Sequence, residues 1–144
     1  MQALEQSERS GGGVLNNVSN ELVHLYKEQF GRGPTKVRSH FAGPDTLICL
    51  LEDSMTPVER NMAVMGEHQR LRDMRLFFQH ATVDQFTEVV ERLTGRKVRA
   101  FVSGMDTQED VSAEIFVFLP VDVDGDGDGN RDGDGNGNGN GNGT

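Results

Sequence analysis

The chain contains one segment twice, and the two copies lie sixty-one positions apart. Each copy opens with Lys-Val-Arg and ends with Gly-x-Asp-Thr: Lys36-Val37-Arg38 with Gly43-Pro44-Asp45-Thr46, then Lys97-Val98-Arg99 with Gly104-Met105-Asp106-Thr107. Each copy follows an amphipathic segment that ends in Gly-Arg, and each precedes an apolar run. The repeat therefore predicts two related helix-strand-strand units.

The apolar runs indicate how the strands of the two units combine. Residues 36–42 and 46–51 are predicted to form one hairpin, and residues 97–103 and 111–119 a second. The second strand of each hairpin is apolar on both faces, which is typical of a central strand or of one covered by a second subunit. We predict an α+β fold with four mostly antiparallel strands, helices on one face of the sheet and a homodimer contact on the other.

One helix is predicted before the first copy of the repeat, and a short helix is predicted after it. Residues 14–30 keep helical apolar spacing until Gly31 and the Gly33-Pro34 pair end the helix. Thr56-Pro57-x-Glu59 is a helix-start signature, because Thr caps exposed amides, Pro suits the first turn and Glu returns a bond to the cap. This short second helix is expected to end near Met65.

One long helix is predicted between Gly66 and Gly95, because no Gly or Pro interrupts this segment and its apolar residues recur at three- to five-residue spacing. Such a helix would be roughly 40 Å long and would leave apolar surface for a partner. The alternative is a break at Thr82, since Thr82-x-x-Gln85 could cap a new helix.

The composition predicts one folded domain, residues 14–120, between two segments that lack apolar residues to bury. Residues 1–13 end in Ser-Gly-Gly-Gly and are expected to be flexible, and residues 121–144 form an acidic Asp/Gly/Asn-rich tail that is expected to be disordered. The tail carries minus five of the net charge of minus nine, so the folded part is mildly acidic. This balance argues against nucleic-acid binding and against docking on anionic lipid.

The sequence predicts a soluble cytoplasmic protein. Residues 1–13 contain no apolar signal-peptide core, and no stretch approaches eighteen consecutive apolar residues. The single cysteine, Cys49, lies in an apolar run and is interpreted as a buried small hydrophobe. Arg makes up eleven of the fourteen basic residues, which together with the acidic balance fits a high-salt or GC-rich source.

No metal, cofactor or catalytic site is predicted. The four histidines show no metal-ligand spacing, and no phosphate-binding loop, dinucleotide fingerprint or nucleophile motif is present. Asp124-x-Asp126-x-Asp128 matches the opening of an EF-hand loop, but Gly135 stands where the closing Glu is required. We therefore expect a protein that is not an enzyme.

Two groups of basic residues are candidate binding sites. Arg38 and His40 share one face of a predicted strand, and Arg99 takes the equivalent place in the second copy, so the three are a candidate anion site. The alternative is a surface strand that pairs with nearby carboxylates. Arg72 and Arg75 belong to a charged stripe on the long helix, which is either a docking surface for a partner or a solvated face.

Four motifs resemble those of the MpsC family, a domain associated with Na⁺-translocating, membrane-potential-generating systems. The motifs are Thr56-Pro57-x-Glu59-Arg60, Arg72-x-x-Arg75-x-x-Phe78, Glu91-x-Leu93-Thr94-Gly95-Arg96-Lys97-Val98-x-x-Phe101-x-Ser103 and Glu114-x-Phe116-Val117. The resemblance covers about residues 14–120. The Leu-Thr-Gly-Arg-x-Val stretch and the upstream Thr-Pro-x-Glu-Arg stretch are fairly specific as a pair.

The resemblance implies an accessory protein of a membrane cation or bicarbonate transport system. Together with the residue patterns, it leads us to expect a non-enzymatic homodimer that regulates or assists an integral-membrane subunit and is held by it at the inner face of the membrane. The alternative is a cytoplasmic sensor that binds a small anion near Arg38, His40 and Arg99 and has no membrane partner.

Overall fold

The computed structural model describes residues 2–121, with side chains from Gly13 onward. Its elements follow in the order α1 (Gln2–Phe30), β1 (Lys36–Phe41), β2 (Thr46–Glu52), α2 (Pro57–Val64), α3 (His68–Thr94), β3 (Val98–Asp106) and β4 (Val111–Phe118). The predicted α+β class is therefore confirmed. The predictions of a disordered tail and of an EF-hand-like opening fall largely on residues 122–144, which lie outside the described residues.

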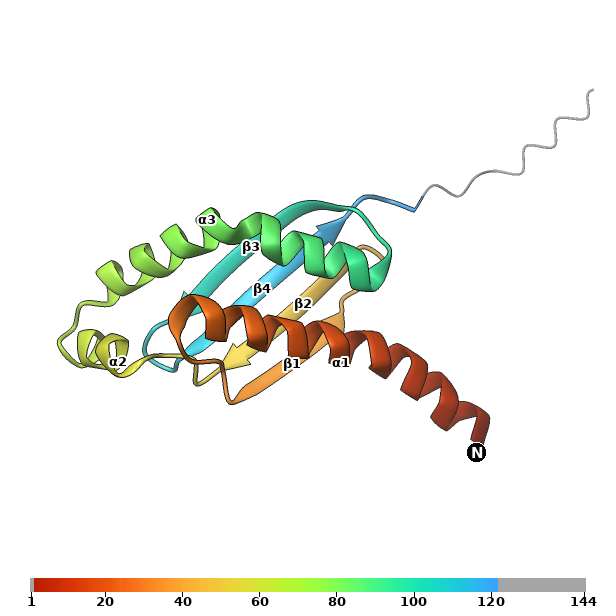
Figure 1. Cartoon of the computed structure of the whole chain (residues 1–144), viewed down its shortest axis with the longest axis horizontal. Coiled ribbons are helices and arrows are strands. Elements are labelled where there is room, and N and C mark those ends of the chain that lie inside the picture. Colours follow the sequence, from red (N-terminus) through yellow and green to blue (C-terminus); the bar gives the residue numbers. More distant parts are fainter. Residues whose placement is uncertain (1, 122–144) are drawn as a thin grey trace, which may run out of the picture.

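The four strands form one antiparallel sheet in the order β1-β2-β4-β3 (Figure 1). Both predicted hairpins are present, and β2 pairs with β4 in the middle of the sheet, with Cys49 opposite Glu114. The two strands that are apolar on both faces are thus the central ones, as predicted. The third strand is longer than expected, because its pairing with β4 continues to Asp106 opposite Val111.

The helices α1 and α3 lie side by side on one face of the sheet (Figure 1). Strand alternation sends every second residue of β2 and β4 toward these helices. The fully buried core comprises Leu47, Cys49 and Leu51 of β2, Phe116 and Phe118 of β4, Val18, Leu22 and Tyr26 of α1, and Phe86 and Val90 of α3. Cys49 is a free, buried thiol, which confirms its interpretation as a small core hydrophobe.

The opposite face of the sheet is also apolar, and no described helix packs over it (Figure 1). The apolar part of this open face consists of alternate residues of three strands: Ile48 and Leu50 of β2, Ala113, Ile115 and Val117 of β4, and Ala100 and Val102 of β3. Arg38 and His40 of β1 lie on the same face, at its edge. Val102 is 54% exposed. The homodimer contact expected on this face stays a prediction.

The helix α3 is unbroken over 27 residues, so the alternative break at Thr82 is wrong. The Thr82 hydroxyl donates a hydrogen bond of 2.7 Å to the carbonyl of Phe78, one turn earlier, and so does not cap a new helix. The helix ends at Gly95, whose φ of 69° favours glycine. Its length is about 40 Å, as expected from the rise per residue.

The helix α1 begins at Gln2, twelve residues before the predicted start at Val14. Its first turns extend beyond the edge of the sheet (Figure 1). Helical hydrogen bonds join residues four apart, so a helix can continue past its packing partner, and each glycine in its interior costs only about 1 kcal/mol relative to alanine. The glycines at 11–13 therefore do not end the helix. The flexibility expected for residues 1–13 stays a prediction.

The short helix α2 starts as its sequence predicts. Thr56 is the N-cap, its hydroxyl accepts from the amide of Glu59 at 3.3 Å, and the Glu59 carboxylate accepts from the amide of Thr56 at 3.0 Å. The helix ends at Val64, one residue before the expected end. Glu59 is a buried residue of this helix, because its carboxylate also contacts α3.

The Gly-Arg pairs of the repeat connect each helix to the far end of its own hairpin. In the first unit, Gly31 has φ of 77° and Arg32 donates from Nη1 to the carbonyl of Asp53 at 2.6 Å. In the second unit, Arg96 follows Gly95 and donates from Nη2 to the carbonyl of Leu119 at 3.1 Å. Both arginines thus join the end of a helix to the residue just beyond the second strand of the same unit.

Replacing Arg96 by Ala should destabilise the fold by roughly 1 to 3 kcal/mol, because the guanidinium also donates to the Asp45 carboxylate at 3.0 Å and lies 4.8 Å from the Phe118 ring. The control is Arg92→Ala, since Arg92 makes an exposed helical pair with Glu88 that contributes about 0.5 kcal/mol or less. Urea unfolding measures both changes, and equal losses would contradict a clamping role for Arg96.

Candidate functional site

A chain of buried polar side chains connects both long helices to the central strand β4. Tyr26 of α1 donates a hydrogen bond to Oε1 of Glu114 on β4. Gln79 of α3 donates from Nε2 to the same oxygen at 2.7 Å and to the Tyr26 hydroxyl at 3.0 Å. Glu114 is fully buried because it takes a helix-facing position in β4, where the neighbouring positions hold Ser112 and Phe116.

The burial of this network changes the protonation of its acid. Burial raises the pKa of Glu114 to about 7, and the nearby groups of Tyr26, Ser103, Gln79 and Arg75 only partly offset that rise. The pKa of Tyr26 is raised well above its usual range, first by burial and then by the negative charge of Glu114. Glu114 is therefore the acid of this network that changes charge near neutral pH.

A buried ion pair lies beside the network and joins α2 to α3. Arg75 Nε is 2.5 Å from Glu59 Oε2, and Arg75 Nη2 is 2.8 Å from Glu59 Oε1 and 3.1 Å from the carbonyl of Ser54. The Arg75 guanidinium also lies 4.0 Å from the centre of the Phe30 ring. Burial raises the pKa of Glu59, but the hydrogen bonds and charge of Arg75 outweigh it, so the pKa falls below its ordinary value.

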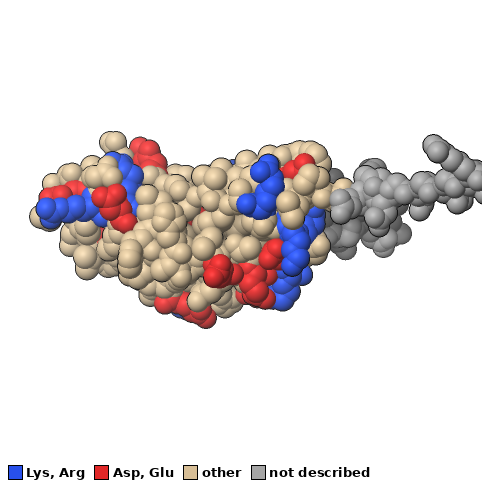
Figure 2. All heavy atoms as spheres, turned by 90° about the horizontal axis from the view of Figure 1, so that it is seen from above, with Lys and Arg blue, Asp and Glu red and all other residues tan. Residues whose placement is uncertain are grey.

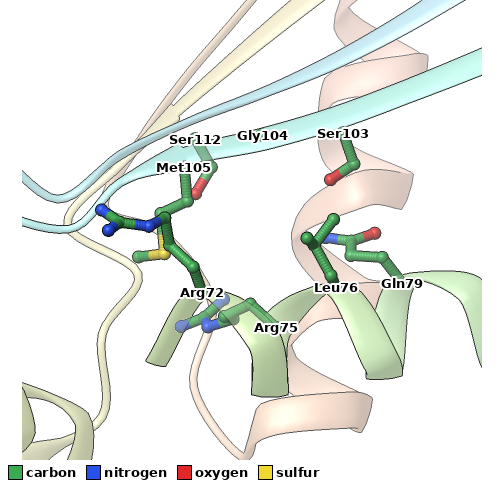
Figure 3. A pocket seen from close by; sticks show the side chains of 8 residues that line it. All are labelled: Arg72, Arg75, Leu76, Gln79, Ser103, Gly104, Met105 and Ser112. Atoms are coloured by element: carbon green, nitrogen blue, oxygen red, sulfur yellow. The ribbon is translucent and has the colours of Figure 1, made fainter. Parts of the chain in front are cut away.

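A pocket of about 250 Å³ opens between α3 and the ends of β3 and β4 (Figure 3). Its lining comes from four side chains of α3 and from four strand residues: Arg72, Arg75, Leu76, Gln79, Ser103, Gly104, Met105 and Ser112. Figure 3 shows Arg72 extending from α3 toward Met105 and Ser112, and Gln79 lying across from Ser103. Arg75 and Gln79 belong both to the pocket wall and to the buried polar groups beneath it.

A family model described as "MpsC: Na+-translocating membrane potential-generating system" matches residues 12–119. The chain belongs to the MpsC family. The match includes both helix-strand-strand units and α2, so the resemblance expected from the sequence is confirmed. Neither curated proteins nor solved structures give a match to this MpsC-family chain. The family description links the chain to a Na⁺-translocating, membrane-potential-generating system.

The structure separates the members of the charged stripe on α3. Arg70 is exposed and lies 3.5 Å from Glu67, as in a solvated helix face. Arg72 is half-buried at the pocket. Arg75 is only 4% exposed and is paired with Glu59. The hypothesis that Arg75 contacts a docking partner is therefore corrected, because its guanidinium is not on the surface.

The structure does not bring the predicted anion-binding residues together. Arg38 and His40 lie on β1, beside a shallow opening that Asn16 and Ser19 of α1 also line. Arg99 lies on β3, at an irregularity in its pairing with β4. The strands β1 and β3 are the two edges of the sheet, separated by three strand spacings or roughly 14 Å. A pocket that holds all three within one chain is therefore not formed.

Among the side chains that the structure describes, residues 13–121, no three of His, Cys, Asp or Glu gather closely enough to hold a metal ion. None of the helices in the same part of the chain combines the length and apolarity needed to cross a bilayer.

Glu114 was missed as a site residue in the sequence, although a signal for it exists. Residues 111–118 alternate so that Ser112, Glu114, Phe116 and Phe118 share one face. A carboxylate at a core-facing position of an apolar strand must be neutral or paired, because an unpaired buried charge is costly. The sequence alone does not show which face of this strand the helices cover, so it does not show that Glu114 is buried.

Replacing Glu114 by Gln should change how stability depends on pH. The pKa of Glu114 is raised to about 7 from 4.5, so the folded state binds the proton more firmly than the unfolded state. Its contribution is complete below about pH 4.5 and is lost as the pH rises through 7. Relative to the variant, the unchanged chain should lose about 2 to 3 kcal/mol of unfolding free energy from about pH 5 to 8.

Urea unfolding at several pH values measures this difference. Glu59 does not confuse the comparison, because its lowered pKa keeps it ionised throughout this range and it is present in both proteins. Glu109→Gln is the matched control, since Glu109 is exposed in the turn before β4. Parallel stability curves for the unchanged chain and Glu114→Gln would contradict the assignment.

Proposed function

We propose that this MpsC-family chain is a non-enzymatic accessory or regulatory protein of a membrane cation or bicarbonate transport system. It acts through protein–protein contacts, as a cytoplasmic homodimer held at the inner face of the membrane by an integral-membrane partner. The family description supports the connection to a transport system. The observation that carries the proposal is the group of exposed large apolar side chains on α2, on the residue after it and on the first half of α3.

That surface contains large side chains in contact with water. Among the exposed apolar residues, this part of the chain contributes Val58, Val64, Met65, Leu76, Phe77 and Phe78. Val64 is 87% exposed and Phe77 is 69% exposed. Figure 2, which looks onto the molecule from above Figure 1, shows a broad uncharged stretch, with basic side chains grouped toward the two ends. Exposed apolar groups of this size are typical of surfaces that bind another protein.

The open face of the sheet supports a separate contact, with a second copy of the chain. Antiparallel sheets with one face in water alternate apolar and polar residues. Here Ile48, Leu50, Ile115 and Val117 make the central part of the open face apolar instead. In a two-fold dimer the same patch of each copy forms the contact, so one apolar face on the chain is enough to cover both copies. The surface on α2 and α3 then remains available for the membrane partner.

Replacing Phe77 by Glu should prevent capture of a membrane partner. The tagged protein is incubated with detergent-solubilised membranes of its source, and bound proteins are identified by mass spectrometry. An integral-membrane transport protein is expected with the unchanged chain and is expected to be lost with Phe77→Glu, because a charge would be buried at the contact. Phe41→Glu, an exposed substitution on β1, is the control and should retain the partner. Capture that survives Phe77→Glu, or no capture at all, would contradict the proposal.

Replacing Val102 by Glu should convert the dimer into a monomer. Val102 lies on the open face and is exposed in the single chain, so the substitution leaves the core intact but places a carboxylate in the proposed contact. Light scattering during size-exclusion chromatography measures the mass. Val58→Glu, on the exposed side of α2, should remain dimeric. A monomeric unchanged chain would exclude the dimer, and a dimeric Val102→Glu variant would exclude this face.

A further inference from the structure

The pocket between α3 and the ends of β3 and β4 has a positive charge that the protein leaves uncompensated. Among the described residues, no carboxylate lies within ion-pair distance of Arg72. Its closest hydrogen-bond partners are the Thr107 hydroxyl at 3.5 Å and the Gln69 side chain at 3.4 Å, both at the limit for such bonds. A half-buried guanidinium with such weak partners indicates a missing acceptor.

Buried polar atoms beneath the pocket also lack hydrogen-bond partners. Arg75 is paired with Glu59, but its Nη1 atom is buried and has no hydrogen-bond partner in the structure. Oε1 of Gln79 is also buried without a partner, but this oxygen is an acceptor, so it requires a donor and does not itself favour an anion. Both residues line the pocket and both are more than nine-tenths buried. Native proteins rarely leave buried polar groups unpaired. A ligand bound in the pocket would supply missing hydrogen-bond partners.

The shape and chemistry of the pocket define the class of ligand. The uncompensated guanidinium of Arg72 disfavours a cation and favours an anion, whereas the charge of Arg75 is balanced by Glu59. Leu76 and Met105 supply apolar wall beside them, and Ser103 and Ser112 supply hydroxyl groups. The volume of about 250 Å³ equals roughly eight times the space that one water molecule takes in the liquid. This suits an anion attached to a few carbon atoms.

We propose that this pocket binds a small monocarboxylate, whose carboxylate pairs with Arg72 and whose short carbon chain lies against Leu76 and Met105. Arg75 offers its unpaired Nη1 donor from beneath the pocket wall. The site is separate from the anion site predicted at Arg38, His40 and Arg99. It goes beyond the proposed function and does not rest on it, since binding is a property of the single chain.

Glu114 couples this binding to protons. The groups that face it are Tyr26 from α1, Arg75 and Gln79 from α3, Cys49 from β2 and Ser103 from β3. Gln79 and Ser103 also line the pocket, so they lie between the bound ligand and Glu114. Burial raises the pKa of Cys49 to about 11 and that of Tyr26 well above its usual range, so neither changes charge near neutral pH. A bound carboxylate is repelled by ionised Glu114 and tolerated by the protonated form. Its affinity therefore falls as the pH rises through about 7, and binding raises the proton affinity of Glu114.

The test is calorimetry and thermal unfolding of the purified chain with sodium propionate and sodium butyrate, at constant ionic strength. At ten times the dissociation constant, the Tm should rise by roughly 5 °C. Propionamide, the neutral analogue of propionate, should give no rise. Arg72→Met should weaken propionate binding by about tenfold or more, because it removes a charge-assisted hydrogen bond. Arg70→Met, on the same helix but outside the pocket, should bind like the unchanged chain.

Two further variants make the outcome decisive. Leu76→Trp should fill the pocket and abolish binding, and Leu76 is sufficiently exposed for the variant to fold. Glu114→Gln should bind propionate with an affinity that no longer falls between about pH 6 and 8. The proposal is overturned by equal affinity in Arg72→Met, by an equal response to propionamide, or by no response to either carboxylate at about 10 mM. An unchanged pH dependence in Glu114→Gln overturns the coupling.

Discussion

The antiparallel pairing of β2 with β4 is the contact on which the rest of the structure depends, because it joins the two helix-strand-strand units into one sheet. Each unit contributes one helix, and both helices cover the same face of the sheet. The fully buried core residues that come from strands lie on β2 and β4 and face the two helices. The same pairing gives the sheet a second apolar face, since both strands are apolar on both sides.

The core formed by this pairing contains an acid at its centre. Glu114 lies opposite Cys49 on the neighbouring strand and is held by Tyr26 from one unit and Gln79 from the other. An apolar residue in its place would be less costly, since burying an unpaired charge is unfavourable. The hydrogen bonds instead connect both long helices to the central strand, and they give the interior one group whose charge depends on pH near neutrality.

The sequence was sufficient for the parts of the fold that depend on local patterns. Alternation placed the central strands correctly, and the Thr56 capping box placed the start of α2. Spatial relations were less accessible, because periodicity tells which face a residue occupies and not which residues meet. Arg38 and Arg99 occupy equivalent places in the repeat, yet the strand order puts them at opposite edges. The burial of Arg75 depends on Glu59, a residue of another helix.

The attachment of α2 has a mechanical consequence. This helix leaves Val58 and Val64 in water, and its buried Glu59 is paired with Arg75 of α3. A bidentate ion pair has a fixed geometry, so a displacement of α2 would also move the Arg75 guanidinium. An apolar contact would instead allow α2 to slide along α3. Arg75 also forms part of the pocket wall. A displacement of α2 is thus coupled to the pocket wall through the Glu59–Arg75 pair.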